Sequence, residues 1–160
     1  MDYIKQADGS GQCMLASAAM VLDTTVDILI NEIGHDGTEI CWPDEPAPRN
    51  QRGYHIQEIL DCFLSRGVSM YRVDGYPLLH VVGCTPRPVY PDAEARFVRL
   101  IEGRRAMIYG TVLRGAHMVA WDGSRVYDPS GSGHDDFEQL CHGFSIECAY
   151  VHSLPAAPFD

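Results

Sequence analysis

Cationic side chains are scarce in this 160-residue chain, which has 12 Lys and Arg against 22 Asp and Glu and a formal net charge of -10. An acidic surface repels phosphate backbones and anionic bilayers, so we expect neither nucleic acid nor a membrane surface as a partner. No apolar run approaches the roughly 18 residues of a membrane-spanning helix, and the opening segment MDYIKQADGS lacks the basic and apolar regions of a secretory signal. These absences favour a cytoplasmic protein.

Closely spaced cysteine pairs are also missing. The chain has six cysteines but no CxxC pair, which is the strongest sequence sign of structural zinc. Without a secretory signal, we expect reduced thiols instead of a disulfide framework. Four residues of ligand type cluster near the end at a spacing unlike that of common zinc sites, and they leave metal binding open as an alternative: Cys141, His142, Cys148 and His152.

The composition, with 46% hydrophobic and 21% charged residues, is that of a folded globular protein. The length fits one domain over residues 1–160, with residues 153–160 as a loosely held tail. Apolar positions at helical spacing predict helices in residues 25–34, 55–67 and 92–105, each with a glycine as its end signal. Residues 13–23 predict a helix that is apolar on nearly every face and therefore buried.

Runs of strand character follow at residues 68–73, 106–113, 116–121, 124–128 and 145–154. Residues 35–53 contain three prolines and predict a long irregular loop, of the kind that often borders a site. Residues 75–91 predict a short strand or extended segment. Helices come first and a mainly antiparallel sheet last, so the order predicts an α+β fold.

The segment GAHMVAWDGSRVYDPSG predicts a hairpin that brings a histidine and a carboxylate together. Asp122-Gly123 is a favoured pair for a two-residue type I′ turn. That turn places His117 directly opposite Asp128, on the same face of the sheet and with Cβ atoms about 4.5–5.5 Å apart. A turn one residue later would pair Val119 with Asp128 instead, and we expect it to weaken the contact between His117 and Asp128.

Cys13 follows a glycine-rich stretch, GSGQ, and opens the apolar helix. The positive end of the helix dipole favours a nucleophilic thiolate at this place. His117 is the candidate general base, and Asp128 the residue that orients its ring. For the developing oxyanion, the N–H group of Cys13 is one donor, and the side chain of Gln6, or alternatively of Gln12, is the other.

Plainer interpretations exist for several of these residues. Cys13 could be a buried structural thiol, and His80 is a rival base without an acid at hairpin distance. For His55 we expect helix capping or solvent exposure. For Trp42 and Trp121 we expect packing instead of a substrate subsite, and Trp42, in the proline-rich loop, is the more plausible of the two for lining a cleft.

The glutamine, the cysteine that opens an Ala-rich helix, and the downstream motifs GAHMVAWDG and VYDPSG together resemble the papain-like cysteine peptidases, most closely the branch that processes bacteriocin leaders at a double glycine. The resemblance spans about residues 6–152, and its specific content lies in two short motifs. It implies a buried N-terminal helix with the cysteine, packed against a C-terminal antiparallel sheet with the histidine and the aspartate. It implies Cys13 as nucleophile, His117 as base and acid, Asp128 as orienting residue and Gln6 as oxyanion donor.

Two positions depart from the pattern of these relatives. Met14 stands where they commonly have glycine, and Gln6 lies seven residues before Cys13 instead of six. The expected function is a cysteine-dependent hydrolase that cleaves a peptide or amide bond through a thioester, with a peptide or protein as substrate. We expect no cofactor, because a cysteine and a histidine supply the nucleophile and the proton shuttle.

The same three residues also serve acyl transfer, glutamine deamidation and isopeptide cleavage. A papain-like module that binds or blocks a peptide without turning it over is an alternative from another class. A third is a metal hydrolase built on Cys141, His142 and His152.

Overall fold

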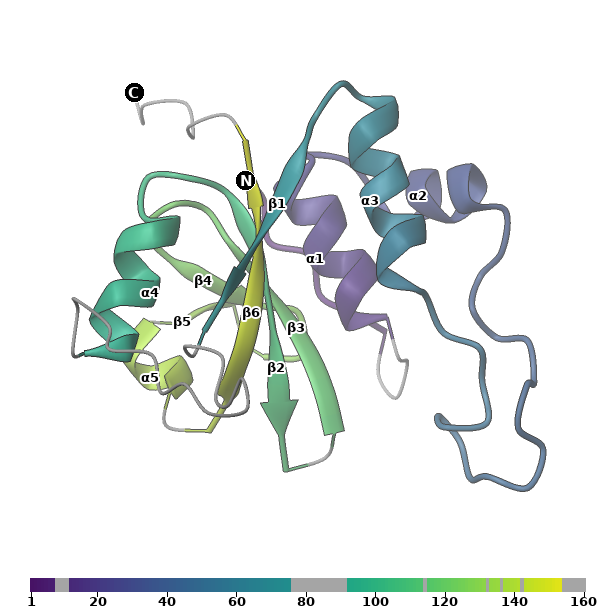
Figure 1. Ribbon diagram of the computed structural model, residues 1–160. Helices are drawn as coiled ribbons and strands as arrows, with labels where there is room; N and C mark the ends of the chain where they lie inside the picture. The colour runs from purple at the N-terminus through teal and green to yellow at the C-terminus, as the bar shows by residue number, and fades with distance from the viewer. Residues whose placement is uncertain are drawn as a thin grey trace, which may run out of the picture.

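The computed structural model describes residues 1–7, 12–75, 92–113, 115–131, 133–135, 137–141 and 143–153. Figure 1 shows the elements found in these ranges. The helices are α1 (Cys13–Val21), α2 (Val26–Ile33), α3 (Ile56–Ser65), α4 (Ala93–Ile101) and α5 (Phe137–Cys141). The strands are β1 (Met70–Asp74), β2 (Ala106–Val112), β3 (Gly115–Trp121), β4 (Val126–Asp128), β5 (Gly133–Asp135) and β6 (Ser145–His152).

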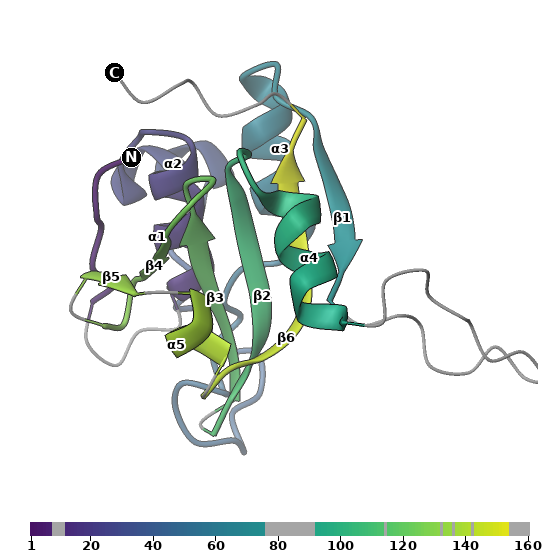
Figure 2. The same ribbon diagram turned by 90° about the vertical axis from the view of Figure 1, so that its left-hand side faces the viewer.

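The strands form one sheet in the order β1-β6-β2-β3-β4-β5. Every neighbouring pair among these strands is antiparallel. Helices α1, α2 and α3 cover one face of the sheet, and α4 and α5 cover the other (Figures 1 and 2). The predicted α+β fold is therefore confirmed.

Local capping explains where the helices begin and end. The Thr25 side chain accepts a hydrogen bond from the N–H of Ile28 at 3.3 Å, and Gly34 ends α2 with φ of 87°. His55 and Glu58 form a capping box at the start of α3. All four predicted helices are present, and the predicted capping role of His55 is confirmed.

The five predicted strands are also present, and residues 35–53 form an irregular loop with one isolated bridge between Ile40 and Gln51. Strand β5 and helix α5 were not predicted, because elements of three and five residues are too short for periodicity to show. The predicted extended segment at 75–91 lies outside the described residues except for Gly75, and so does the predicted tail except for Ser153.

Strand β3 takes part in two hydrophobic cores, one on each face of the sheet. Val119 and Trp121 belong to the core under α4, and the Trp121 indole N–H donates to the carbonyl of Ile101 at 3.1 Å. Met118 and Ala120 belong to the core under α1. Every residue of α1 from Leu15 to Val21 is buried, so the prediction of a helix buried on nearly every face is confirmed.

Within the described ranges, no single helix has both the length and the apolar character needed to cross a membrane. Only α1 and α2 taken together reach that length, and they are bent by 108° relative to each other.

Candidate active site

Cys13 is the first residue of α1 and is half-buried. The residue before it, Gln12, makes no side-chain capping hydrogen bond, so no side chain caps the N–H groups of the first turn from that position. One turn further along, the buried Ser17 hydroxyl donates to the carbonyl of Met118 at 3.1 Å. This bond ties the helix that carries Cys13 to the strand residue next to His117.

His117 lies in β3, is 8% exposed, and forms a hydrogen bond between its Nε2 and Oδ1 of Asp128 at 2.8 Å. The N–H and the hydroxyl of Ser130 also donate to Oδ1 of Asp128, each at 2.8 Å. Three donors thus converge on one carboxylate oxygen. They fix the carboxylate, and the carboxylate in turn fixes the imidazole ring.

The contact between His117 and Asp128 is present, but the predicted register of the hairpin is wrong. The strands pair Trp121 with Val126, and the N–H of Asp122 donates to the carbonyl of Arg125 at 3.1 Å. The turn therefore consists of residues 123 and 124, one position later than predicted. The Asp122 carboxylate selects it by accepting from the N–H groups of residues 124 and 125 at 2.8 and 2.7 Å.

The expected weakening of the contact in this register is also wrong. Moving the turn by one residue moves the pairing by two, and side chains two positions apart on a strand point to the same face. His117 and Asp128 become diagonal neighbours on one face, which long side chains can still bridge. Strand β4 pairs with β3 only at Trp121 and Ala120. The hydrogen bond between His117 and Asp128 therefore joins the two strands beyond the last backbone pair between them.

The charges around His117 favour its protonated form. Burial would lower the pKa of His117, but hydrogen bonds with Asp128 and Cys13, and the charges of both, raise it to about 9. Because Nε2 contacts Asp128, the nitrogen left for Cys13 is Nδ1. Burial raises the pKa of Asp128, but the bonds from His117 and Ser130 outweigh it and the net shift is downward. The three predicted side chains therefore lie together, since Asp128 bonds to the imidazole and both Asp128 and Cys13 raise its pKa.

Two further residues that the sequence did not indicate position the imidazole. Gly110 pairs with His117 across β2 and β3. A Cβ on Gly110 would lie 2.3 Å from the carbonyl oxygen of Ser145 and 2.6 Å from the ring of Phe144. The Phe144 ring meets the imidazole edge to face, with ring centroids 6.1 Å apart and an interplanar angle of 74°. Glycine leaves the space that this buried phenylalanine occupies beside His117.

A backbone hydrogen bond holds Gln6 next to the residue that follows Asp128. The N–H of Gln6 donates to the carbonyl of Pro129 at 2.9 Å, directly after Asp128. Its side-chain oxygen is buried and has no hydrogen-bond partner among the described residues. Its role as oxyanion donor, and the alternative of Gln12, stay predictions.

The proposed metal ligands do not come together in the part of the chain that the structure describes. Burial and the neighbouring Glu94 raise the pKa of Cys141 to about 11, and Cys148 is buried in β6. No group of three His, Cys, Asp or Glu side chains suited to a metal ion occurs among the described residues. His142, the rival base His80 and Cys84 lie outside them.

No known protein-family model matches this sequence, and no curated protein matches it either.

Proposed function

We propose that this chain is a cysteine-dependent hydrolase of the papain-like kind, most simply a peptidase. The observation that carries the proposal is the 2.8 Å hydrogen bond between His117 and Asp128, beside a Cys13 that lies close enough to the same imidazole to help raise its pKa. The arrangement of a buried helix that begins at the cysteine, packed on an antiparallel sheet that bears the other two residues, also supports it.

In the first half of the reaction, the Cys13 sulfur attacks the acyl carbon of an amide. The carbonyl oxygen becomes an oxyanion, which the N–H of Cys13 at the helix start stabilises. The C–N bond then breaks, and His117 gives its proton to the leaving nitrogen. An amine departs and the acyl group remains on sulfur as a thioester.

In the second half, a water molecule attacks the thioester and His117 accepts one of its protons. The C–S bond breaks, the carboxylic acid leaves, and the imidazolium again faces a thiolate. Asp128 stays ionised throughout and keeps Nε2 of His117 engaged, so that Nδ1 faces the sulfur. The sum is one amide and one water converted to one acid and one amine.

Alkylation by iodoacetamide at pH 7 tests the activated thiol without a substrate. A thiolate held against an imidazolium reacts faster than an ordinary thiol, so we expect Cys13 to react ahead of Cys41, which is exposed and serves as the control within the same molecule. Burial raises the pKa of Cys62 and Cys148, so these thiols should react last. Equal rates for Cys13 and Cys41 would contradict the proposal.

The reaction itself is identified by mass spectrometry of peptides and proteins incubated with wild-type protein and with Cys13→Ala. Cleavage gives two fragments that together gain one water, deamidation adds about one mass unit, and transfer moves an acyl mass. Cys41→Ala is the matched control and should retain the activity. Turnover that survives in Cys13→Ala would exclude the mechanism. A reactive Cys13 without any turnover would favour the alternative of a peptide-binding module.

A further inference from the structure

The loop between α2 and α3, residues 34–55, is the longest connection within the described residues. In both Figures 1 and 2 it extends at the end of the molecule where α1 and β3 begin, the end that carries Cys13 and His117. Long loops inside a compact fold are usually either disordered or functional. The internal order of this one favours function.

Backbone hydrogen bonds join the two sides of this loop. The N–H of Cys41 donates to the carbonyl of Asn50 at 2.9 Å, and the N–H of Arg52 donates to the carbonyl of Glu39 at 2.7 Å. Between these bonds lies the isolated bridge between Ile40 and Gln51. The loop therefore has a defined backbone out to its tip.

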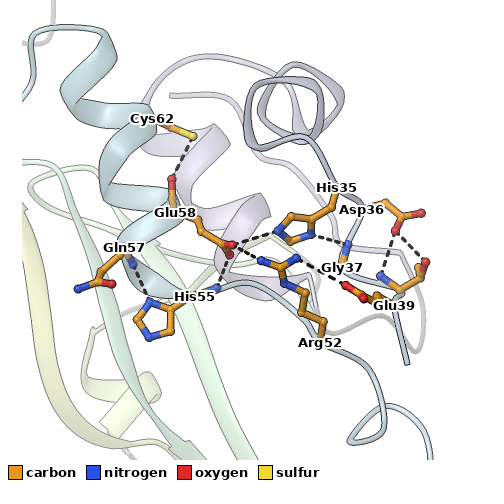
Figure 3. Close-up of polar contacts among 10 residues, drawn as sticks. His35, Asp36, Gly37, Glu39, Arg52, His55, Gln57, Glu58 and Cys62 are labelled. Carbon is orange, nitrogen blue, oxygen red and sulfur yellow. Dashed lines mark hydrogen bonds and ion pairs between the residues drawn. The ribbon is translucent and has the colours of Figure 1, made fainter. Parts of the chain in front are cut away.

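Side chains fasten the base of the loop to α3, as Figure 3 shows. His35 Nε2 and Arg52 Nη2 both contact Oε1 of Glu58, at 3.2 and 2.8 Å. The ring of His35 also stacks on Tyr54, with centroids 5.2 Å apart. Contacts from both ends of the loop thus meet on one α3 carboxylate, and they hold the loop in place against the helix.

The outer part of this ordered loop presents apolar side chains to solvent. Trp42 is 55% exposed and Ile40 is 54% exposed. The Trp42 carbonyl accepts from the N–H of Glu45 at 3.0 Å, which closes a turn with Pro43 at its second position. An indole on a preorganised turn loses little further conformational freedom when a partner covers it, and it supplies a large apolar contact.

Acidic side chains outnumber basic ones in the loop around Trp42. Residues 35–53 contain Asp36, Glu39, Asp44 and Glu45 against Arg49 and Arg52. Arg52 lies 3.5 Å from Glu39, whereas Asp44 and Glu45 are exposed and form no ion pair with any described residue. A cationic side chain would find two carboxylates free there, and an indole face as well, which attracts cations.

We propose that residues 39–48 bind the substrate of this site, and that the substrate is a peptide segment with Lys or Arg next to an apolar side chain. The cation pairs with Asp44 and Glu45, and the apolar side chain packs on Trp42 and Ile40. This inference rests on the proposed function, because only an enzyme has a substrate. The binding of the peptide itself requires no chemistry at Cys13.

The test uses the full chain with Cys13→Ala and a positional-scanning library of acetylated, amidated octapeptides. We expect the retained peptides to be enriched in Lys or Arg and in large apolar residues. Adding Trp42→Ala should weaken the binding of a selected peptide by tenfold or more, as loss of a central aromatic contact does. Adding Asp44→Lys and Glu45→Lys should reverse the preference from cationic to anionic peptides. High salt should weaken the binding of the selected peptide to the Cys13→Ala protein that has no change in the loop.

Matched controls are Leu64→Ala, which truncates a side chain that is 65% exposed on α3, and Glu102→Lys with Asp2→Lys, which places two new charges at exposed sites elsewhere. Both should leave the selected peptides unchanged. The inference would be overturned if the retained peptides were not enriched in Lys or Arg. It would also be overturned if neither Trp42→Ala nor the pair Asp44→Lys and Glu45→Lys changed which peptides are retained. A dimer in sedimentation that Trp42→Ala dissociates would overturn it as well, since a second copy would then occupy the loop.

The two proposals fail separately. If wild-type protein turns over substrates while its Cys13→Ala form selects no cationic peptide, the inference is wrong and the hydrolase stands. If the library selects cationic peptides through Trp42 but no substrate is ever converted, the loop is a binding surface and the hydrolase proposal is wrong.

Discussion

Gly110→Ala tests the way in which the sheet positions His117. A methyl group at this place would lie 2.3 Å from the backbone oxygen of Ser145, which must retreat by about 1 Å to reach an ordinary contact of 3.4 Å. It would also lie 2.6 Å from the ring of Phe144, which is 5% exposed. Neither a backbone carbonyl nor a buried ring can move freely, so β2 and β6 must separate.

This strain has two expected results. Overpacking of a buried site destabilises a fold by about 1–3 kcal/mol, which urea denaturation measures. His117 pairs directly with Gly110, so the imidazole should shift by up to the same distance as the backbone. Misplacement of a reacting group by about 1 Å can reduce a rate by on the order of 10²-fold.

The assay for the second effect is the rate at which iodoacetamide modifies Cys13, with Cys41 as the internal reference. Gly143→Ala is the matched control, because a Cβ there meets no atom within 4 Å. We expect the control to behave like wild type in both measurements. A Gly110→Ala protein that is as stable and as reactive as wild type would refute the packing argument.

Three further predictions concern single polar side chains. Asp128→Asn removes one of the charges that raise the pKa of His117 to about 9 and weakens the hydrogen bond to its ring, so NMR should show its imidazole titrating at lower pH. In wild type the stabilisation from protonated His117 is complete below pH 6.5 and is lost as the pH rises through about 9, and this loss should shrink in the variant. Ser17→Ala breaks the bond to Met118 and should lower the free energy of unfolding by about 1 kcal/mol in urea; an unchanged midpoint would contradict its anchoring role. Asp122→Ala leaves the turn donors without their acceptor and should cost about 2–4 kcal/mol by thermal denaturation. Because these bonds hold the pKa of Asp122 below 3.8, the corresponding stability in wild type should fade only as acid protonates that carboxyl.

The sequence predicted the partners at the candidate site better than their geometry. His117 and Asp128 share a face because strand side chains alternate with period two, and any register that differs by two residues preserves this. The position of the turn depends on which backbone N–H groups the Asp122 side chain binds. Asp122-Gly123 is a favoured turn pair, but here the Asp122 carboxylate accepts N–H bonds from the residues that follow, and this places the turn one residue later.

Phe144 and Gly110 could not be predicted, because their meeting depends on a third strand. Strand β6 pairs with β2, and the register shifts by one residue between Tyr109 and Gly110. This irregularity brings the carbonyl of Ser145 and the ring of Phe144 over the glycine. A strand glycine in the sequence is a sign of close approach, but the sequence does not say what approaches.

The helices were predictable because their signals are local. Thr25, Gly34 and the pair of His55 and Glu58 act within a few residues of the helix ends that they define. The order of strands in the sheet is a nonlocal property. The pairing of β1, the first strand, with β6, the last, cannot be read from either segment alone.

Strand β3 contributes side chains to both hydrophobic cores, and this has a consequence for how the protein is expected to unfold. The imidazole of His117 packs on Phe144 of one core, while Cys13 packs against the other. Neither layer can melt alone without separating the Cys13 sulfur from the imidazole. The reactivity of the thiol and the burial of Trp121 are therefore expected to disappear together on heating, in one cooperative transition.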